Sequence, residues 1–243
     1  MAPAEMDFRL DGYEPANDHV EKHFWQHIEI NQDMLTALAE HHTDDGQHSY
    51  YVLHDGSVTW GIPGEPQLVA LHLHRDTQER NFRFQHDVLP LPSMAQSWLI
   101  ARGCPPDAIG LSADMGTTAA DDATKALEQR LMSDADHFAL LHSYTDDTSA
   151  TQETTVLLRA TDERTPLPFR ILLEEVDLDN STHTLREGGF ATVEAATEWW
   201  ENRWAGEDTP ALTAPPAGHR TTPSAAPAHP LPTMPPAPRG RGR

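Results

Sequence analysis

The sequence has little of three things that often indicate a function: cysteine, lysine and long apolar runs. Its 243 residues include one cysteine, Cys104, so neither an internal disulfide nor a multi-thiolate metal site can form within one chain. No stretch approaches the ~18 consecutive apolar residues of a membrane-spanning helix. The segment MAPAEMDFRLDGYEP also lacks the basic start and apolar run of a secretion signal. We therefore expect a cytoplasmic protein that does not engage a membrane.

Positive charge is scarce. Lys and Arg number 17 against 38 Asp and Glu, which gives a formal net charge of −21, and the only lysines are Lys22 and Lys125. Residues 206–243 hold two acids and four arginines, so they contribute +2 and leave −23 on residues 1–205. Such a surface repels nucleic acid and anionic membranes, because like charges would be brought together. The balance favours a basic protein partner.

The short motifs of common enzyme classes are missing from the sequence. It contains no G-x-S-x-G, no G-x-x-x-x-G-K, no G-x-G-x-x-G and no H-E-x-x-H. Cys104 lies in RGCPPD with no visible base beside it, whereas a cysteine nucleophile needs a base or a lowered pKa. We therefore predict no catalytic residue, and the sequence favours a non-catalytic protein.

Composition divides the chain into three parts. Residues 1–16 are polar and predicted to be a flexible N-terminus, and residues 17–205 carry the apolar periodicity of an acidic globular body. Residues 206–243 hold 10 of the 20 prolines among Ala, Thr and Gly, and therefore predict a disordered tail.

Periodicity predicts the elements of the first half. Val20, Phe24 and Ile28 recur every four residues and predict an amphipathic helix from residue 19 to about residue 42. Residues 49–61 predict two strands around the turn Asp55–Gly56. Residues 67–76 and 81–89 predict two further strands, and residues 93–103 predict a helix.

The second half repeats this order of elements. Residues 117–135 predict a helix, residues 137–144, 154–161, 169–178 and 181–190 predict strands, and residues 192–204 predict a closing helix capped by Thr192. Short turns between strands favour antiparallel pairing. The predicted class is α+β, with mostly antiparallel sheets, flanking helices and two similar halves at residues 17–103 and 104–205.

Histidines supply the first candidate metal site. His19, His23 and His27 share one face of the first predicted helix, a spacing at which imidazoles bind transition metals. Each also lies one position from the apolar stripe, where amphipathic side chains cover the border between core and water. We favour this second interpretation for the three residues.

A second candidate site lies on the predicted strands. His72 and His74 point to the same side of one strand, because alternate residues share a face. His54 or His86 from a neighbouring strand would supply a further ligand. The candidate metal ligands are therefore His54, His72, His74 and His86, and the expected metal is zinc or iron.

Other polar and aromatic groups have simpler interpretations. Glu175, Asp177 and Asp179 share a strand face but fail the calcium-loop pattern, so we expect a solvated surface. Tryptophans at helical spacing indicate core or interface anchors: Trp98, Trp199, Trp200 and Trp204. The terminal sequence PRGRGR is a candidate for nucleic-acid contact, which we do not expect of the acidic body.

Three hypotheses for the function follow from the sequence. The first, which we favour, is a non-catalytic binding or accessory protein whose acidic surface engages a basic protein partner without a cofactor. The second is a metal-dependent enzyme with the histidine cluster on its sheet. The third is a structural or oligomer-forming protein built around its tryptophan-bearing helices.

Overall fold

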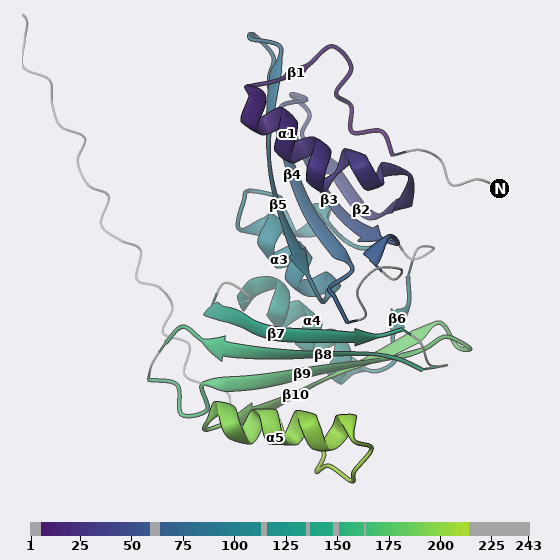
Figure 1. The fold of residues 1–243 in the computed structure, drawn as a ribbon, viewed down its shortest axis with the longest axis vertical. Coiled ribbons are helices and arrows are strands. Elements are labelled where there is room, and N and C mark those ends of the chain that lie inside the picture. The colour runs from purple at the N-terminus through teal and green to yellow at the C-terminus, as the bar shows by residue number, and fades with distance from the viewer. Residues whose placement is uncertain are drawn as a thin grey trace, which may run out of the picture.

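The protein folds into two five-stranded sheets with helices between them and on their outer faces (Figure 1). In the computed structural model of the chain, the described residues are 6–58, 64–112, 116–134, 137–147, 151–162 and 164–213. No helix within these ranges is long and apolar enough to cross a membrane.

Each sheet belongs to one half of the chain. The first half contains β1 (Glu14–Pro15), α1 (Asp18–His27), the 3₁₀ helix η1 (Glu29–Met34), β2 (Leu35–His42), β3 (His48–Asp55), β4 (Leu68–Asp76), β5 (Asn81–Leu89) and α3 (Pro92–Ile100). A short 3₁₀ helix, η2 (Pro106–Ala108), follows. The second half contains β6 (Thr118–Ala119), α4 (Asp122–Asp134), β7 (Phe138–Asp146), β8 (Thr151–Ala160), β9 (Phe169–Asp177), β10 (Thr182–Phe190) and α5 (Val193–Trp204).

The two sheets share one topology. The first, sheet A, has the order β1-β5-β4-β3-β2, and the second, sheet B, has the order β6-β10-β9-β8-β7. Only the short pairs β1/β5 and β6/β10 are parallel, and the other neighbouring strands are antiparallel. The predicted α+β class, the mostly antiparallel pairing and the two similar halves are confirmed.

Local details repeat between the halves. The side chain of Asn17 caps α1 by accepting from the third residue of the helix, and Asp121 does the same for α4. Arg80 and Ser181, which precede β5 and β10, both have a positive φ. β2 and β7 each carry one irregularity at the same place in their pairing. Equivalent positions in the two halves can therefore be compared residue by residue.

Helices and sheets alternate in layers (Figure 1). α1 covers the outer face of sheet A, where Phe24 belongs to a core with the residues of β3 and β4. α3 and α4 lie between the sheets, and Leu99 and Leu131 share a core with both sheets. α5 covers the outer face of sheet B, where Trp199 is buried. The position equivalent to α1 in the second half is therefore inside the molecule.

The predicted helix up to residue 42 is wrong beyond η1, because residues 35–42 form β2. β3 is buried on both faces, and the edge that does not pair with β4 needs another strand to satisfy its backbone N–H and C=O groups. This requirement overrides the weak helical period of residues 35–42. The predicted hairpin at Asp55–Gly56 also differs. Ser57 and Val58 are not in a strand, and residues 59–63 of that prediction lie outside the described residues.

The segment after α5 lies against sheet B. The indole Nε1 of Trp199 donates to the carbonyl of Pro210 at 2.9 Å, and the N–H of Gly189 donates to the carbonyl of Thr213 at 3.4 Å. The side chain of Leu212 packs onto the core beneath α5. The rest of the predicted tail, residues 214–243, lies outside the described residues.

Candidate functional site at the N-terminal segment

Residues 6–13 lie on the outer face of sheet A beside α1, where aromatic packing holds them. The Phe8 ring is buried and meets Phe24 at 5.9 Å and Tyr51 at 5.6 Å between centroids, both edge to face. Such pairs are worth about 0.5–1.5 kcal/mol beyond the area that they bury. The chain then pairs with β5, since the N–H of Glu14 donates to the carbonyl of Arg80 at 3.0 Å.

Arg75 ties this segment to the sheet. Its buried guanidinium donates to the carbonyls of Phe8 at 2.6 Å and Arg9 at 3.0 Å, and to Ser49 Oγ at 2.9 Å. Gln32 adds a further bond from η1, because its Nε2 donates to the carbonyl of Met6 at 2.6 Å. Arg75 on the sheet and Gln32 on η1 therefore satisfy backbone carbonyls of a segment whose residues 6–13 are not part of a β-sheet.

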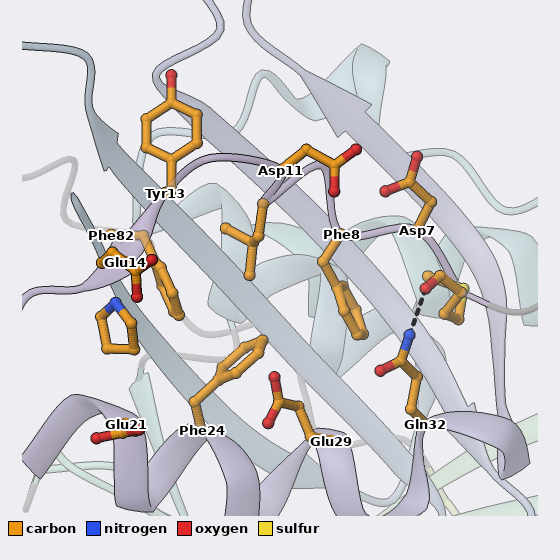
Figure 2. Close-up of a pocket in the computed structure, with 13 residues that line it drawn as sticks. Asp7, Phe8, Asp11, Tyr13, Glu14, Glu21, Phe24, Glu29, Gln32 and Phe82 are labelled. Atoms are coloured by element: carbon orange, nitrogen blue, oxygen red, sulfur yellow. Dashed lines mark hydrogen bonds between the residues drawn. The ribbon is translucent and has the colours of Figure 1, made fainter. Parts of the chain in front are cut away.

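A pocket of about 440 Å³ opens between this segment, α1 and η1 (Figure 2). Phe8 points into it from the segment, Phe24 points toward it from α1, and Phe82 lies behind on β5. These rings form an apolar floor. Five exposed carboxylates line the rest of the pocket: Asp7, Asp11, Glu14, Glu21 and Glu29.

No cation balances these carboxylates within the pocket, since the described residues that line it include no Lys, Arg or His. Arg80 stands nearby, where its guanidinium lies 4.8 Å from the centre of the Tyr13 ring. A pocket of this kind suits the side chain of lysine or arginine. The methylene stem would lie over the floor formed by the buried phenyl rings, and the charge would lie among the carboxylates.

Two of the four predicted metal ligands lie together on the inner face of sheet A. His48 joins them from β3: its Nδ1 lies 3.0 Å from His72 Nε2, and its ring centroid lies 4.7 Å from that of His74. The ring of Tyr50 stacks on His72 at 4.5 Å. His48 was not among the ligands predicted from the sequence. Its pairing with His74 follows once the register between β3 and β4 is known.

The other two predicted ligands lie elsewhere. His54 is at the far end of β3, where its Nε2 lies 3.2 Å from Gln67 Oε1. His86 pairs with Leu71 and therefore faces the side opposite to His72, with its ring 4.6 Å from that of His27. Within the described ranges, no group of three or more His, Cys, Asp or Glu side chains is arranged to hold a metal ion.

Packing favours the neutral form of His72 and His48. Burial, with the nearby His48, His74 and Arg102, lowers the pKa of His72 to about 4. Burial and His74 also lower the pKa of His48. Neutral imidazoles can serve as metal ligands. Here, however, the rings stack with Tyr50 and with each other, and this packing is enough to explain why they are buried.

The helical histidines form a row of rings. Centroid distances are 4.1 Å between His19 and His23 and 5.7 Å between His23 and His27. Partial burial and the two neighbouring rings lower the pKa of His23. His27 is exposed, and the row lies beside the apolar contacts of Phe24, as expected for a helix shoulder.

The remaining candidates have structural roles. Glu175 accepts from Arg203 Nη2 at 2.7 Å, and Asp177 accepts from the N–H groups of Asp179 and Asn180 at a turn. Cys104 is buried, and burial raises the pKa of its thiol to about 11, which disfavours the nucleophilic thiolate.

The acidic pocket was not predicted from the sequence. The apolar residues that alternate with charged ones in MDFRLDG are the one signal that precedes it, because apolar side chains in such a segment often mark a contact. The pocket also depends on Arg75, whose partners are distant in sequence. Comparison with protein-family models, with curated proteins and with solved structures finds no match to this chain.

Proposed function

We propose that this protein is a non-catalytic binding protein that receives a lysine or arginine side chain of a basic protein partner in the acidic pocket. The observation that supports the proposal is the composition of that pocket, in which five carboxylates surround a phenyl floor. A cation there would gain several charge partners at short range. These contacts require neither a metal nor a reacting group.

The charge of the whole chain supports the same proposal. A net charge of −21 creates a field that attracts basic proteins from a distance and speeds their association. That long-range contribution weakens as salt is added, because the Debye length falls to about 8 Å at physiological ionic strength. The pocket contributes the short-range part, which depends on where the carboxylates stand rather than on how many the chain has.

The test separates position from total charge. A fluorescent peptide of alternating lysine and alanine is titrated with two variants, each of which loses three negative charges. The pocket variant carries Asp11→Asn, Glu14→Gln and Glu21→Gln. The control variant carries Glu194→Gln, Glu198→Gln and Glu201→Gln on the exposed face of α5.

We expect the pocket variant to bind the peptide at least about tenfold more weakly than the control, a loss of about 1.4 kcal/mol. The loss should be present in low salt and in physiological salt, because the contacts are short. Equal affinity of the two variants would show that only net charge matters and would refute the pocket as the binding site. Absence of binding by the unmodified protein in low salt would refute the proposed function.

A further inference from the structure

Within the described residues, one edge of β5 is unpaired along most of its length. β1 pairs only with Asn81 and Phe82. Beyond that point the edge strand is exposed at Arg83, Gln85 and Asp87. An unpaired edge presents a row of backbone N–H and C=O groups to whatever approaches it.

The bonds to β1 show which groups face outward. The carbonyls of Arg80 and Phe82 accept from β1. Because backbone groups alternate along a strand, the N–H and C=O groups of Phe84, His86 and Val88 point to the same side. The N–H of Val88 is bonded by the side chain of its own neighbour, since it donates to Asp87 Oδ1 at 3.0 Å.

The equivalent edge in sheet B is closed by the chain itself. The N–H of Leu185, which corresponds to Phe84, donates to Thr124 Oγ1 on α4 at 3.1 Å. The N–H of Gly189, which corresponds to Val88, donates to the carbonyl of Thr213. Leu185 and Gly188 are buried there, whereas their equivalents Phe84 and Asp87 are half-buried and exposed.

One substitution between the halves explains part of the difference. Val20 stands on α1 where Thr124 stands on α4, since their N–H groups bond to the equivalent caps Asn17 and Asp121 at 3.0 and 2.8 Å. Valine has no acceptor to offer Phe84. The first half therefore leaves open a backbone position that the second half satisfies.

A cavity of about 450 Å³ lies along this open edge. Its walls come from both flanking helices, with Val20 and His23 on α1 and Trp98 on α3, and Phe84 and Asp87 of β5 lie between them. Trp98 is the seventh residue of α3, as Trp199 is of α5. In the second half that tryptophan donates to Pro210 of the segment covering the edge.

We propose that the open edge of β5 binds an extended segment of a basic protein, which adds a strand to sheet A beside Phe84–Val88. Strand addition of this kind draws affinity from backbone hydrogen bonds and specificity from alternate side chains. The inference rests on the proposed function for the positive charge of the partner.

The occupant differs in one respect from the segment that covers β10. Leu212 lies against Gly188, where an added Cβ would be only 2.5 Å from Leu212 Cδ2. The equivalent residue of β5 is Asp87, so a lysine or arginine fits there in place of leucine. Arg102 lies on the same face of β5 as Asp87, where it stacks on Trp98 at 3.4 Å and bonds Gln85, so we place the basic residue at the Asp87 end.

The test uses a short, acetylated and amidated peptide of alternating valine and lysine. One version is N-methylated at every valine and another at every lysine, so both keep the same charge but lose opposite rows of N–H groups. We expect one methylated peptide to bind within about twofold of the parent peptide and the other at least about tenfold more weakly, because only one row faces β5. Equal affinities of the two would overturn edge pairing.

Two variants of the protein test the same edge. Val20→Thr supplies the acceptor that Thr124 supplies in the second half, so the variant should bind the parent peptide several-fold more weakly. Val20→Ala, which removes packing without adding an acceptor, is the matched comparison, and Val20→Thr should bind the parent peptide several-fold more weakly than Val20→Ala does. Equal binding by Val20→Thr and Val20→Ala would overturn the inference. The proposed function fails separately, through the charge variants of the acidic pocket.

Discussion

Replacement of Arg75 by methionine should release the N-terminal segment and remove one wall of the acidic pocket. Methionine has a similar length and flexibility, so it fills the space but donates no hydrogen bond. The carbonyls of Phe8 and Arg9 would then lose their donors, and the one on Phe8 is buried. The segment that carries Asp7 and Asp11 is held in part by these two bonds.

The magnitude follows from the groups left behind. A buried acceptor that loses its partner costs about 1–3 kcal/mol, so the two acceptors, of which the one on Arg9 is part-buried, cost at most about 2–6 kcal/mol. Removing a charge from a buried position offsets part of this cost. We therefore expect Arg75→Met to lower the free energy of unfolding by about 2–4 kcal/mol.

Urea unfolding measures the loss of stability, and limited proteolysis measures release of the segment. Trypsin should cleave the peptide bond after Arg9 in Arg75→Met at urea concentrations at which the rest of the protein is still folded. Arg75→Lys is the control, because lysine keeps the charge but cannot donate to several acceptors at once. Its free energy of unfolding should lie between those of the unmodified protein and Arg75→Met. A loss below about 0.5 kcal/mol with the segment still protected would refute the anchoring role, since that is the range of neutral surface changes.

Three further outcomes follow from buried groups. Because the folded pKa of His72 is about 4 against an ordinary value of 6.5, the unfolded chain takes up the proton first as the pH falls. The contribution of His72 to stability is thus full above pH 6.5 and is lost as the pH falls toward 4, by about 1 kcal/mol near pH 5 after discounting for partial exposure. An equal fall of the urea midpoint with pH in the unmodified protein and in His72→Phe would contradict this. Glu187→Gln should lower the free energy of unfolding in urea by about 3–5 kcal/mol, because it leaves Arg130 and Arg170 beside a neutral buried group. A loss below about 0.5 kcal/mol, as for a surface substitution, would contradict this role of Glu187. Cys104 should resist a thiol reagent until denaturant is added, and prompt reaction of the folded protein would show that it is accessible.

Element types were predictable where the apolar pattern was strong. The strands at β4 and β9 have continuous apolar runs, and Thr192 was identified as the cap of α5 because its side chain type and position fit. β2 was misread because Leu35 and Leu38 happen to continue a helical period. The two-residue strands β1 and β6 have no local pattern, since they exist only by pairing with a distant strand.

The candidate sites show the same limit. Alternation correctly placed His72 and His74 on one face, because that depends on one strand alone. It could not place His86, since the face shared by two strands depends on the register set by their turn. The acidic pocket needs Phe8 and Arg75 to meet, although neither belongs to a periodic pattern and they are 67 residues apart in sequence.

The most direct test of the proposed function is a nuclear magnetic resonance titration of the protein with the lysine-alanine peptide. The account predicts saturable shifts concentrated on the pocket, at the ring signals of Phe8, Phe24 and Phe82 and at the backbone of Glu29. Shifts of equal size at the acidic face of α5, with none at these rings, would contradict it. The protein would then attract cations by its charge alone and have no receiving site at the N-terminal segment.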